Sequence, residues 1–378
     1  MRSISRVLLA GTLFLVGCGA SDDATVTHFP AMHQPRAGHT QTPLADGRVL
    51  LAGGLHHLKS VLPPANHVLE IFDPATLTFT AVGRMTTVRI LHTATRLTDG
   101  RVVFIGGSPG TTVDVFDPAT GRISTVGEIL EPRMGHTATL LADGRILIVG
   151  GMHQTASYKD GKLDAGYKYL RSIEVYDPGS GLSVSFPAAL RGMRRGHTAT
   201  RLADGRVMIL GGSWERRAEM IDTVRGVKEW GPSLHVPRED HRTTRLADGR
   251  LLLTGGTDMD GRSIAVAEIY DPKTRRFRRL EAPMIRKRED HTATLLPDGR
   301  VLIVGGEDNA GGKDRKDLVL DDVEIFETKT ETFVKLDPLR VPRDEHHASA
   351  LPDGSVLVTG GAGNDERARD SAEIILPP

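Results

Sequence analysis

A hairpin-forming unit that recurs seven times is the sequence feature that most constrains the fold. Its clearest copy spans residues 133–151, in which an apolar stretch beginning at His136 leads to Asp143-Gly144 and then to a second apolar stretch ending in a Gly-Gly pair. Asp-Gly between two such stretches predicts a β-hairpin, because the primed two-residue turn requires φ > 0 and glycine adopts it without a Cβ clash.

The seven copies share one spacing. In each, a histidine stands three residues after an Arg, seven before the Asp of an Asp-Gly pair and 14 before the first Gly of a Gly-Gly pair. The histidines are His39, His92, His136, His197, His241, His291 and His346. A single functional site does not need seven copies, so we predict a structural role, in which each histidine caps the start of an inner strand and is bonded locally.

A second recurring segment follows each Gly-Gly pair. Its clear copies include the stretches 70–74 (Glu-Ile-Phe-Asp-Pro) and 268–272 (Glu-Ile-Tyr-Asp-Pro). β-Branched and aromatic residues favour a strand, and Asp-Pro ends it because proline cannot continue the hydrogen-bond ladder. A shorter fourth strand follows, marked by Phe79 and Phe277 in these two copies. The expected unit therefore has four antiparallel strands, and its third-strand Glu is expected to pair with an Arg of the repeat.

In the Arg-x-x-His, Gly-Gly and Glu-x-Tyr-Asp-Pro motifs, the chain resembles the kelch family of β-propellers, which includes the central domain of galactose oxidase. The period of about 50 residues per unit agrees with that family. The resemblance implies an all-β fold, a seven-bladed kelch-type β-propeller with four antiparallel strands per blade over residues 25–378. The segment from Thr25 to Phe29 has no blade of its own. We predict that it pairs with Glu373 to Leu376, so that the N-terminal strand completes the last blade and closes the ring.

The N-terminal residues read as a secretory signal. Arg2 and Arg6 precede an apolar stretch over residues 7–16, which is too short to span a membrane. The sequence Leu-Val-Gly-Cys ending at Cys18 resembles the lipobox of bacterial lipoproteins, which implies lipidation of that cysteine, the only one in the chain. We expect a signal peptide over residues 1–18, a tether over 19–24 and a bacterial cell-envelope location through this anchor, in the periplasm or at the outer membrane. The alternative is an ordinary signal peptide with an incidental cysteine.

The length variation between units falls in one set of loops. From each Gly-Gly pair to the acidic residue of the next strand there are 15, 6, 22, 6, 11, 17 and 11 residues. In an alternating four-stranded blade, these loops share one face with the Arg-x-x-His segments. Insertions collected on one face of a repeat array usually mark its binding face.

The predicted binding face also carries uneven charge and most of the tyrosines. Its candidate residues are Arg194, Arg195, Arg216, Arg217, Glu239, Asp240, Glu289, Asp290, Asp344, Glu345, Tyr158, Tyr167 and Tyr169. The six carboxylates stand between Arg and His in the last three units, where they are expected to form an acidic crescent. Three interpretations stay open: local ion pairs with Arg238, Arg288 and Arg343, a cationic ligand or Ca²⁺, and a partner of complementary charge. The tyrosines suit either sugar stacking and protein contacts or packing of their own loop.

Composition limits the functions further. Lys+Arg and Asp+Glu both number 48, and no long basic run occurs, so nucleic-acid binding is not expected. We predict a non-catalytic binding module for a protein or glycan, with no cofactor, no assigned metal ligands, no catalytic residue and membrane contact through the lipid anchor only. The alternative is a carbohydrate-active enzyme of the mutarotase or epimerase type, with acid and base groups over the channel mouth. A copper oxidase resembling galactose oxidase needs a cysteine-crosslinked tyrosine, and the predicted mature chain has no cysteine.

Overall fold

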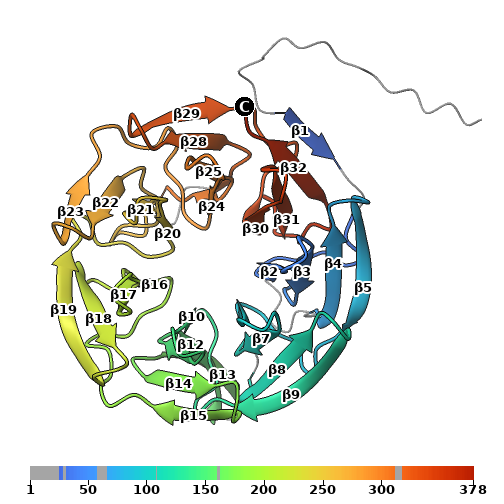
Figure 1. Cartoon of the computed structure of the whole chain (residues 1–378), viewed down its shortest axis with the longest axis vertical. Coiled ribbons are helices and arrows are strands. Elements are labelled where there is room, and N and C mark those ends of the chain that lie inside the picture. Colours follow the sequence, from blue (N-terminus) through green and yellow to red (C-terminus); the bar gives the residue numbers. More distant parts are fainter. Residues whose placement is uncertain (1–24, 29–30, 58–65, 108, 160–161, 311–316) are drawn as a thin grey trace, which may run out of the picture.

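The structure, a computed structural model, describes residues 25–28, 31–57, 66–107, 109–159, 162–310 and 317–378. In these ranges the chain forms seven four-stranded antiparallel sheets arranged radially about one axis (Figure 1). The predicted all-β, seven-bladed propeller is therefore confirmed. No helix among the described residues has the length and apolarity to cross a membrane.

Blades one to six each take their strands from one sequence unit, in order from the axis outward, and blade seven takes its outermost strand from the beginning of the chain. Blades one to four consist of β2 (Thr40–Pro43), β3 (Val49–Ala52), β4 (Val68–Asp73) and β5 (Thr78–Arg84); β6 (Thr93–Arg96), β7 (Val102–Ile105), β8 (Thr112–Asp117) and β9 (Arg122–Glu128); β10 (Thr137–Leu140), β11 (Ile146–Val149), β14 (Ile173–Asp177) and β15 (Leu182–Ser185); and β16 (Thr198–Arg201), β17 (Val207–Leu210), β18 (Arg217–Asp222) and β19 (Val227–Ser233).

The remaining blades follow the same order. Blades five to seven consist of β20 (Arg242–Arg245), β21 (Leu251–Thr254), β22 (Ala267–Asp271) and β23 (Arg276–Arg279); β24 (Thr292–Leu295), β25 (Val301–Val304), β28 (Val323–Glu327) and β29 (Thr332–Leu336); and β30 (Asp344–Ala350), β31 (Val356–Ala362), β32 (Ala372–Leu376) and β1 (Thr25–His28). Two further hairpins, β12 (Met152–Lys159) with β13 (Lys162–Tyr169) and β26 (Glu307–Asp308) with β27 (Leu318–Val319), arise from the two longest insertions.

The ring closes through the chain ends, as predicted. Strand β1 pairs antiparallel with β32, with Thr25 opposite Leu376 and His28 opposite Glu373. Phe29, the predicted signal peptide and the tether lie outside the described residues. Closure leaves β1 as the outermost strand of blade seven, so this blade joins the first and last segments of the propeller (Figure 1).

The Asp-Gly turns differ from the expected primed turns. In blade one, Gly47 N donates to Leu44 O (3.3 Å), and Gly47 has φ of 87° whereas Asp46 keeps a negative φ. The connection is therefore a turn followed by one left-handed glycine, the three-residue type of hairpin loop. Asp46 Oδ1 accepts from Arg48 N (3.1 Å), which holds the loop. Aspartate is required here as an acceptor, not for positive φ.

The apolar core lies between neighbouring blades. The second strand of every blade is buried along its whole length, because it packs on both faces. Val49 and Phe72 of blade one, for example, cluster with Leu357 and Ile374 of blade seven. Apolar burial of this kind is the main favourable term in folding and holds each blade to the next.

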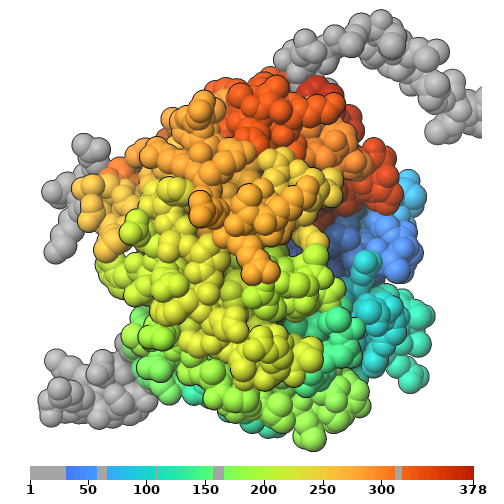
Figure 2. Space-filling model, turned by 60° about the vertical axis from the view of Figure 1, so that its left-hand side comes forward, coloured from blue at the N-terminus to red at the C-terminus, as the bar shows by residue number. Residues whose placement is uncertain are grey.

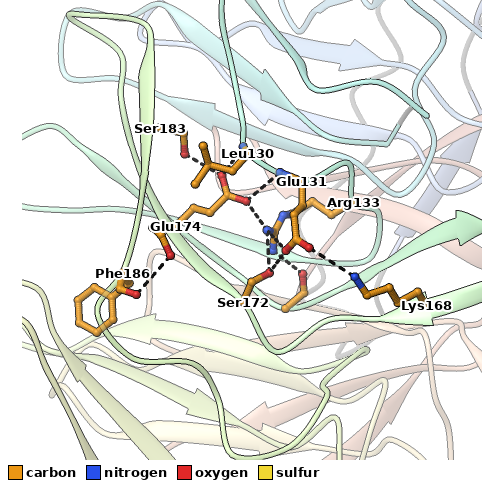
Figure 3. Close-up of polar contacts among 10 residues, drawn as sticks. Leu130, Glu131, Arg133, Lys168, Ser172, Glu174, Ser183 and Phe186 are labelled. Atoms are coloured by element: carbon orange, nitrogen blue, oxygen red, sulfur yellow. Dashed lines mark hydrogen bonds and ion pairs between the residues drawn. The ribbon is translucent and has the colours of Figure 1, made fainter.

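A buried Arg–carboxylate pair reinforces every blade (Figure 3 shows that of blade three). The pairs are Arg36–Glu70, Arg89–Asp114, Arg133–Glu174, Arg194–Glu219, Arg238–Glu268, Arg288–Glu324 and Arg343–Glu373, the expected pairing of repeat Arg and third-strand acid. Each Arg also donates through Nη1 to the carbonyl of the first Gly of its own Gly-Gly pair, at 2.5–2.9 Å. Its own carbonyl accepts from the second Gly of the preceding blade, as Arg89 O does from Gly54 N (2.9 Å). The Arg therefore ties strand to strand and blade to blade.

The seven repeat histidines bond across the blade interface, so the prediction of local bonding is wrong. His92 Nε2 lies 2.9 Å from Thr40 Oγ1 of the preceding blade, and His136 Nε2 lies 3.0 Å from Thr93 Oγ1. Burial lowers the pKa of all seven, which keeps the rings neutral. The Gly-Gly pairs make room for them: a Cβ on Gly106 would stand 2.3 Å from Arg133 O and 2.6 Å from His136 Cε1.

Candidate functional site

The residue before each repeat histidine forms a backbone ring at one end of the axis. In all seven blades this residue has a left-handed conformation, with φ between 47° and 59°; the residues are Gly38, Leu91, Gly135, Gly196, Asp240, Asp290 and Glu345. Neighbouring members hydrogen-bond to one another, as Asp240 N does to Gly196 O (2.8 Å) and Asp290 N to Asp240 O (3.2 Å). Glycine suits this conformation, and the aspartates and the glutamate adopt it only at a cost in free energy.

The three carboxylates at ring positions belong to consecutive blades, five to seven, and face a channel cavity of about 290 Å³. Asp240, Asp290 and Glu345 line this cavity together with Arg242 and His347. Their position follows from the repeat, since each occupies the site that glycine occupies in blade one. The acidic crescent predicted from the sequence thus has three members in the channel wall.

Arg242 and His347 line the channel too, and neither is among the residues predicted for the binding face. Both stand directly after the repeat histidine, where the other five blades have threonine, the hydroxyl to which the next blade's histidine bonds. The histidine of the following blade bonds instead to a second-strand threonine of blade five or seven: His291 Nε2 to Thr254 Oγ1 (2.8 Å) and His39 Nε2 to Thr359 Oγ1 (2.9 Å).

The exchange is visible in the sequence. Thr254 and Thr359 are the only residues directly before a Gly-Gly pair that carry a hydroxyl. In blades five and seven, the threonine that bonds the histidine stands on the second strand instead of the first, and an ionisable residue occupies the first-strand position at the channel. A comparison of the seven units position by position finds both departures. The interface bond is kept, and a charged side chain is gained in the channel wall.

Mutual repulsion and burial control the charge of the crescent. Burial, followed by the charges of Asp240 and Glu345, raises the pKa of Asp290 well above its usual range. Burial, followed by Asp240 and Glu307, raises the pKa of Glu289 to about 8. Burial, followed by Arg242, lowers the pKa of His347 to about 4. A full set of charges is thus unfavourable here unless a cation approaches.

The expected local ion pairs with the repeat arginines do not form. Arg238, Arg288 and Arg343 are buried and pair with the third-strand acids instead. Among the described residues, the ion pairs of the crescent are Arg195–Glu239 (Nη2 to Oε1, 3.2 Å) and Arg242–Asp290 (Nη2 to Oδ1, 3.8 Å). Local ion pairs therefore leave most carboxylates of the crescent without a paired cation. The two other interpretations, a cationic ligand or Ca²⁺ and a partner of complementary charge, stay open.

A larger cleft, of about 610 Å³, opens where blades four and five meet. Its wall is formed by the inter-blade segments around Arg195 and Glu239 and by the loops that carry Trp214 and Met259, with Tyr169 of β13 at the edge. Figure 2 shows the surfaces of blades four to six, yellow-green to orange, side by side. Trp214 is 70% exposed, an unusual state for a side chain of its size. We refer to this feature as the blade four–five cleft.

The arginines predicted for the binding face have separate positions. Arg195 lines the cleft and lies over the ring of Tyr169, 5.9 Å from its centroid. Arg194 is fully buried against Glu219, so its assignment to the binding face is wrong. Arg217 stacks on Trp230 of the outer strand β19 (4.9 Å), and Arg216 is exposed outside the cleft. Only Arg195 of the Arg194-Arg195 pair therefore reaches the surface.

The three predicted tyrosines lie on the β12–β13 hairpin. Tyr169 lines the blade four–five cleft, and Tyr167, two residues earlier on the same face of β13, is 55% exposed. The side chain of Tyr158 lies outside the described residues. Of the alternatives left open by the sequence, packing of the loop alone does not account for Tyr169, which contacts Arg195 of the next blade.

No family model matches the sequence. Among curated proteins, too, none matches. Among solved structures, the chain is similar to a fungal alcohol oxidase of the AA5 family determined in complex with copper, with a TM-score of 0.73 and 19% sequence identity over 94% of this chain and 76% of that one. At this identity the likeness concerns the fold alone.

The described residues do not fit a copper centre of the tyrosine–cysteine type. Tyr176 and Tyr270 are buried in the apolar clusters, Tyr167 and Tyr169 lie on the hairpin, and the seven repeat imidazoles bond threonines of the adjacent blade. The donors gathered at the channel are mainly carboxylates, which suit hard cations rather than copper. The comparison and the geometry together identify the chain as a seven-bladed β-propeller with a galactose-oxidase-like structural neighbour.

Proposed function

We propose that this protein is a non-catalytic binding module that holds a segment of a partner protein in the blade four–five cleft. The observation that carries the proposal is the exposure of large apolar side chains in a concave surface: Trp214 (70%), Met193 (55%), Met259 (52%) and Tyr169 (37%). Exposed large apolar groups gathered in a groove are typical of interaction sites.

The residue types favour a polypeptide over a glycan. Trp, Tyr, Met and Arg are the residues enriched at protein interfaces, and methionine adapts its shape to varied apolar partners. Three carboxylates, Glu215, Glu239 and Asp258, lie at the same cleft. We therefore infer a ligand segment that presents apolar side chains flanked by Lys or Arg.

A peptide-display selection tests this proposal. Peptides selected on the wild-type protein are expected to combine an aromatic or aliphatic residue with basic residues, and to lose binding to Trp214→Ala and Tyr169→Ala. Val224→Ala is the matched control, because Val224 is 92% exposed and lies in the turn between β18 and β19. Peptides that bind all variants equally, or glycans whose binding requires Trp214 while no peptide is selected, would contradict the proposal.

We also propose that the seven units are kelch repeats and that lipidation of Cys18 anchors the protein in the cell envelope, as the sequence motifs suggest. Two or more acyl chains give stable anchoring where one is marginal. Cys18→Ala is expected to move the protein from the membrane fraction to the soluble fraction. Continued retention of that variant in washed membranes would refute the anchor without bearing on the cleft.

A further inference from the structure

Three carboxylates near the channel mouth have the spacing of a cation site. One oxygen each from Asp240, Glu289 and Asp290 lies within 4.8 Å of the other two. Oxygen ligands of Ca²⁺ stand at about 2.3–2.6 Å from the ion, so oxygens on opposite sides of it are up to about 5 Å apart. A single ion can therefore touch all three carboxylates without a backbone movement. Since Asp240 belongs to blade five and the other two to blade six, such an ion joins two blades.

A buried carboxylate with one oxygen that has no hydrogen-bond partner lies near these three. Asp344 is only 7% exposed, and its Oδ1 has no hydrogen-bond partner. The Asp344 carboxylate interacts electrostatically with Glu289 and with Asp290, two of the three cluster members. An acceptor withdrawn from water and left without a donor costs about 1–3 kcal/mol. This cost is avoided when a cation occupies the cluster.

The positive charges of the chain do not balance the cluster. Arg242 lies 3.8 Å from Asp290, and Arg195 pairs with Glu239 rather than with any of the three. Burial raises the pKa of all three carboxyl groups, and neighbouring carboxylates raise it further at Glu289 and Asp290. Arg195 and Arg242 oppose the shift at Asp240 without cancelling it. The adjoining channel cavity of about 290 Å³, which Asp240 and Asp290 line, has room for the water molecules that complete a calcium shell.

We propose that Asp240, Glu289 and Asp290 bind one hard divalent cation, for which Ca²⁺ has the fitting size, at the interface of blades five and six. The donors are carboxylate oxygens, which hard cations prefer over the nitrogen and sulfur ligands of copper or zinc. Asp344 adds negative charge beside the ion. The site stabilises the ring at the channel mouth and does not depend on the ligand of the blade four–five cleft.

Calorimetric titration of CaCl₂ into the chelator-treated, dialysed full chain tests the proposal. One binding site is expected, and thermal denaturation is expected to occur at a higher temperature with CaCl₂ and to return to the starting value with a chelator. Glu289→Gln and Asp290→Asn are each expected to weaken calcium binding at least about tenfold, because each removes one charged ligand. Both variants are also expected to melt at a higher temperature than the wild type in calcium-free buffer, because they remove repulsion.

Two controls make the result specific. Glu281→Gln changes an exposed carboxylate and is expected to leave calcium affinity unchanged. Asp290→Gly restores the residue that blades one, three and four carry at this ring position, so it keeps the backbone conformation while removing the ligand. Absence of a calcium signal at millimolar concentration, tighter binding of Mg²⁺ than of Ca²⁺, or wild-type affinity in Glu289→Gln would overturn the proposal.

Discussion

Replacing Glu268 by alanine tests the buried ion pairs that recur in every blade. The Glu268 and Arg238 side chains are both fully buried and are joined at 2.7 Å between Oε1 and Nη2. The same carboxylate accepts from His235 N (2.8 Å) and Val236 N (3.2 Å). It therefore also holds the segment that leads into β20, the first strand of the same blade. Glu268→Ala therefore leaves a buried guanidinium and two backbone donors without their acceptor.

The size of the effect follows from these contacts. Removing one partner of a buried ion pair costs about 3–5 kcal/mol, because the remaining charge stays buried without compensation. At about 2.1 cal/mol/K per residue, a propeller of about 350 residues unfolds with an entropy of about 0.7 kcal/mol/K. The melting temperature of Glu268→Ala should therefore fall by about 4–7 °C. Because whole domains are stable by only about 5–15 kcal/mol, the variant should lose a large part of its stability.

Calorimetry and urea denaturation of three variants separate charge from packing. Glu268→Gln keeps the volume and one acceptor, so it should fall between wild type and Glu268→Ala. Glu281→Ala, an exposed change next to the same blade's outer strand, should leave the transition within about 0.5 kcal/mol of wild type. The reasoning is wrong if Glu268→Ala unfolds at the wild-type temperature, or if Glu281→Ala lowers the transition as much.

Three further predictions concern the channel end of the propeller. Thr254→Val should lower the free energy of unfolding by about 1–3 kcal/mol, because His291 Nε2 loses its buried partner; equal urea midpoints would contradict this. Burial, followed by Arg194, lowers the pKa of His197 from 6.5 to about 3. The unfolded chain then takes up the proton first, so His197 alone costs the folded state about 1.4 kcal/mol per pH unit as the pH falls from 6.5 towards 3. His197→Gln should make the slope of stability against pH in urea titrations less steep by that amount, and an unchanged slope would contradict this. Asp240→Gly should stabilise the calcium-free protein by about 1–3 kcal/mol, since glycine removes the left-handed strain and one buried charge; a lower melting temperature would refute this.

Constant spacing let the sequence predict the parts of the structure that repeat. His136 and its six equivalents keep one distance to the Asp-Gly and Gly-Gly pairs, and such a pattern has few folded solutions besides a ring of identical blades. The closure of β1 on β32 followed because a segment without a blade and a blade without a fourth strand complement each other. The pairing of Arg238 with Glu268 followed because both recur in every unit.

Predictions failed where the direction of a single side chain determines whether a residue is buried or lies at the surface. Arg194 and Arg195 are neighbours with the same charge, but one is buried against Glu219 and the other lines the cleft. The repeat histidines bond to threonines of the preceding blade, and the pattern within one unit does not show a contact between two units. Arg242 departs from the repeat already in the sequence, because five of the six other units have threonine at its position.

The sequence by itself determined the number of blades, their strands and the face on which they differ, because hydrophobic period and turn chemistry act within one unit. Only the tertiary structure decided that Asp240 of blade five meets Glu289 and Asp290 of blade six, and that Tyr169 of the third blade's hairpin reaches Arg195 of the fourth. Such contacts join different units, and their distances depend on how closely the blades pack around the axis and on which way each side chain points there.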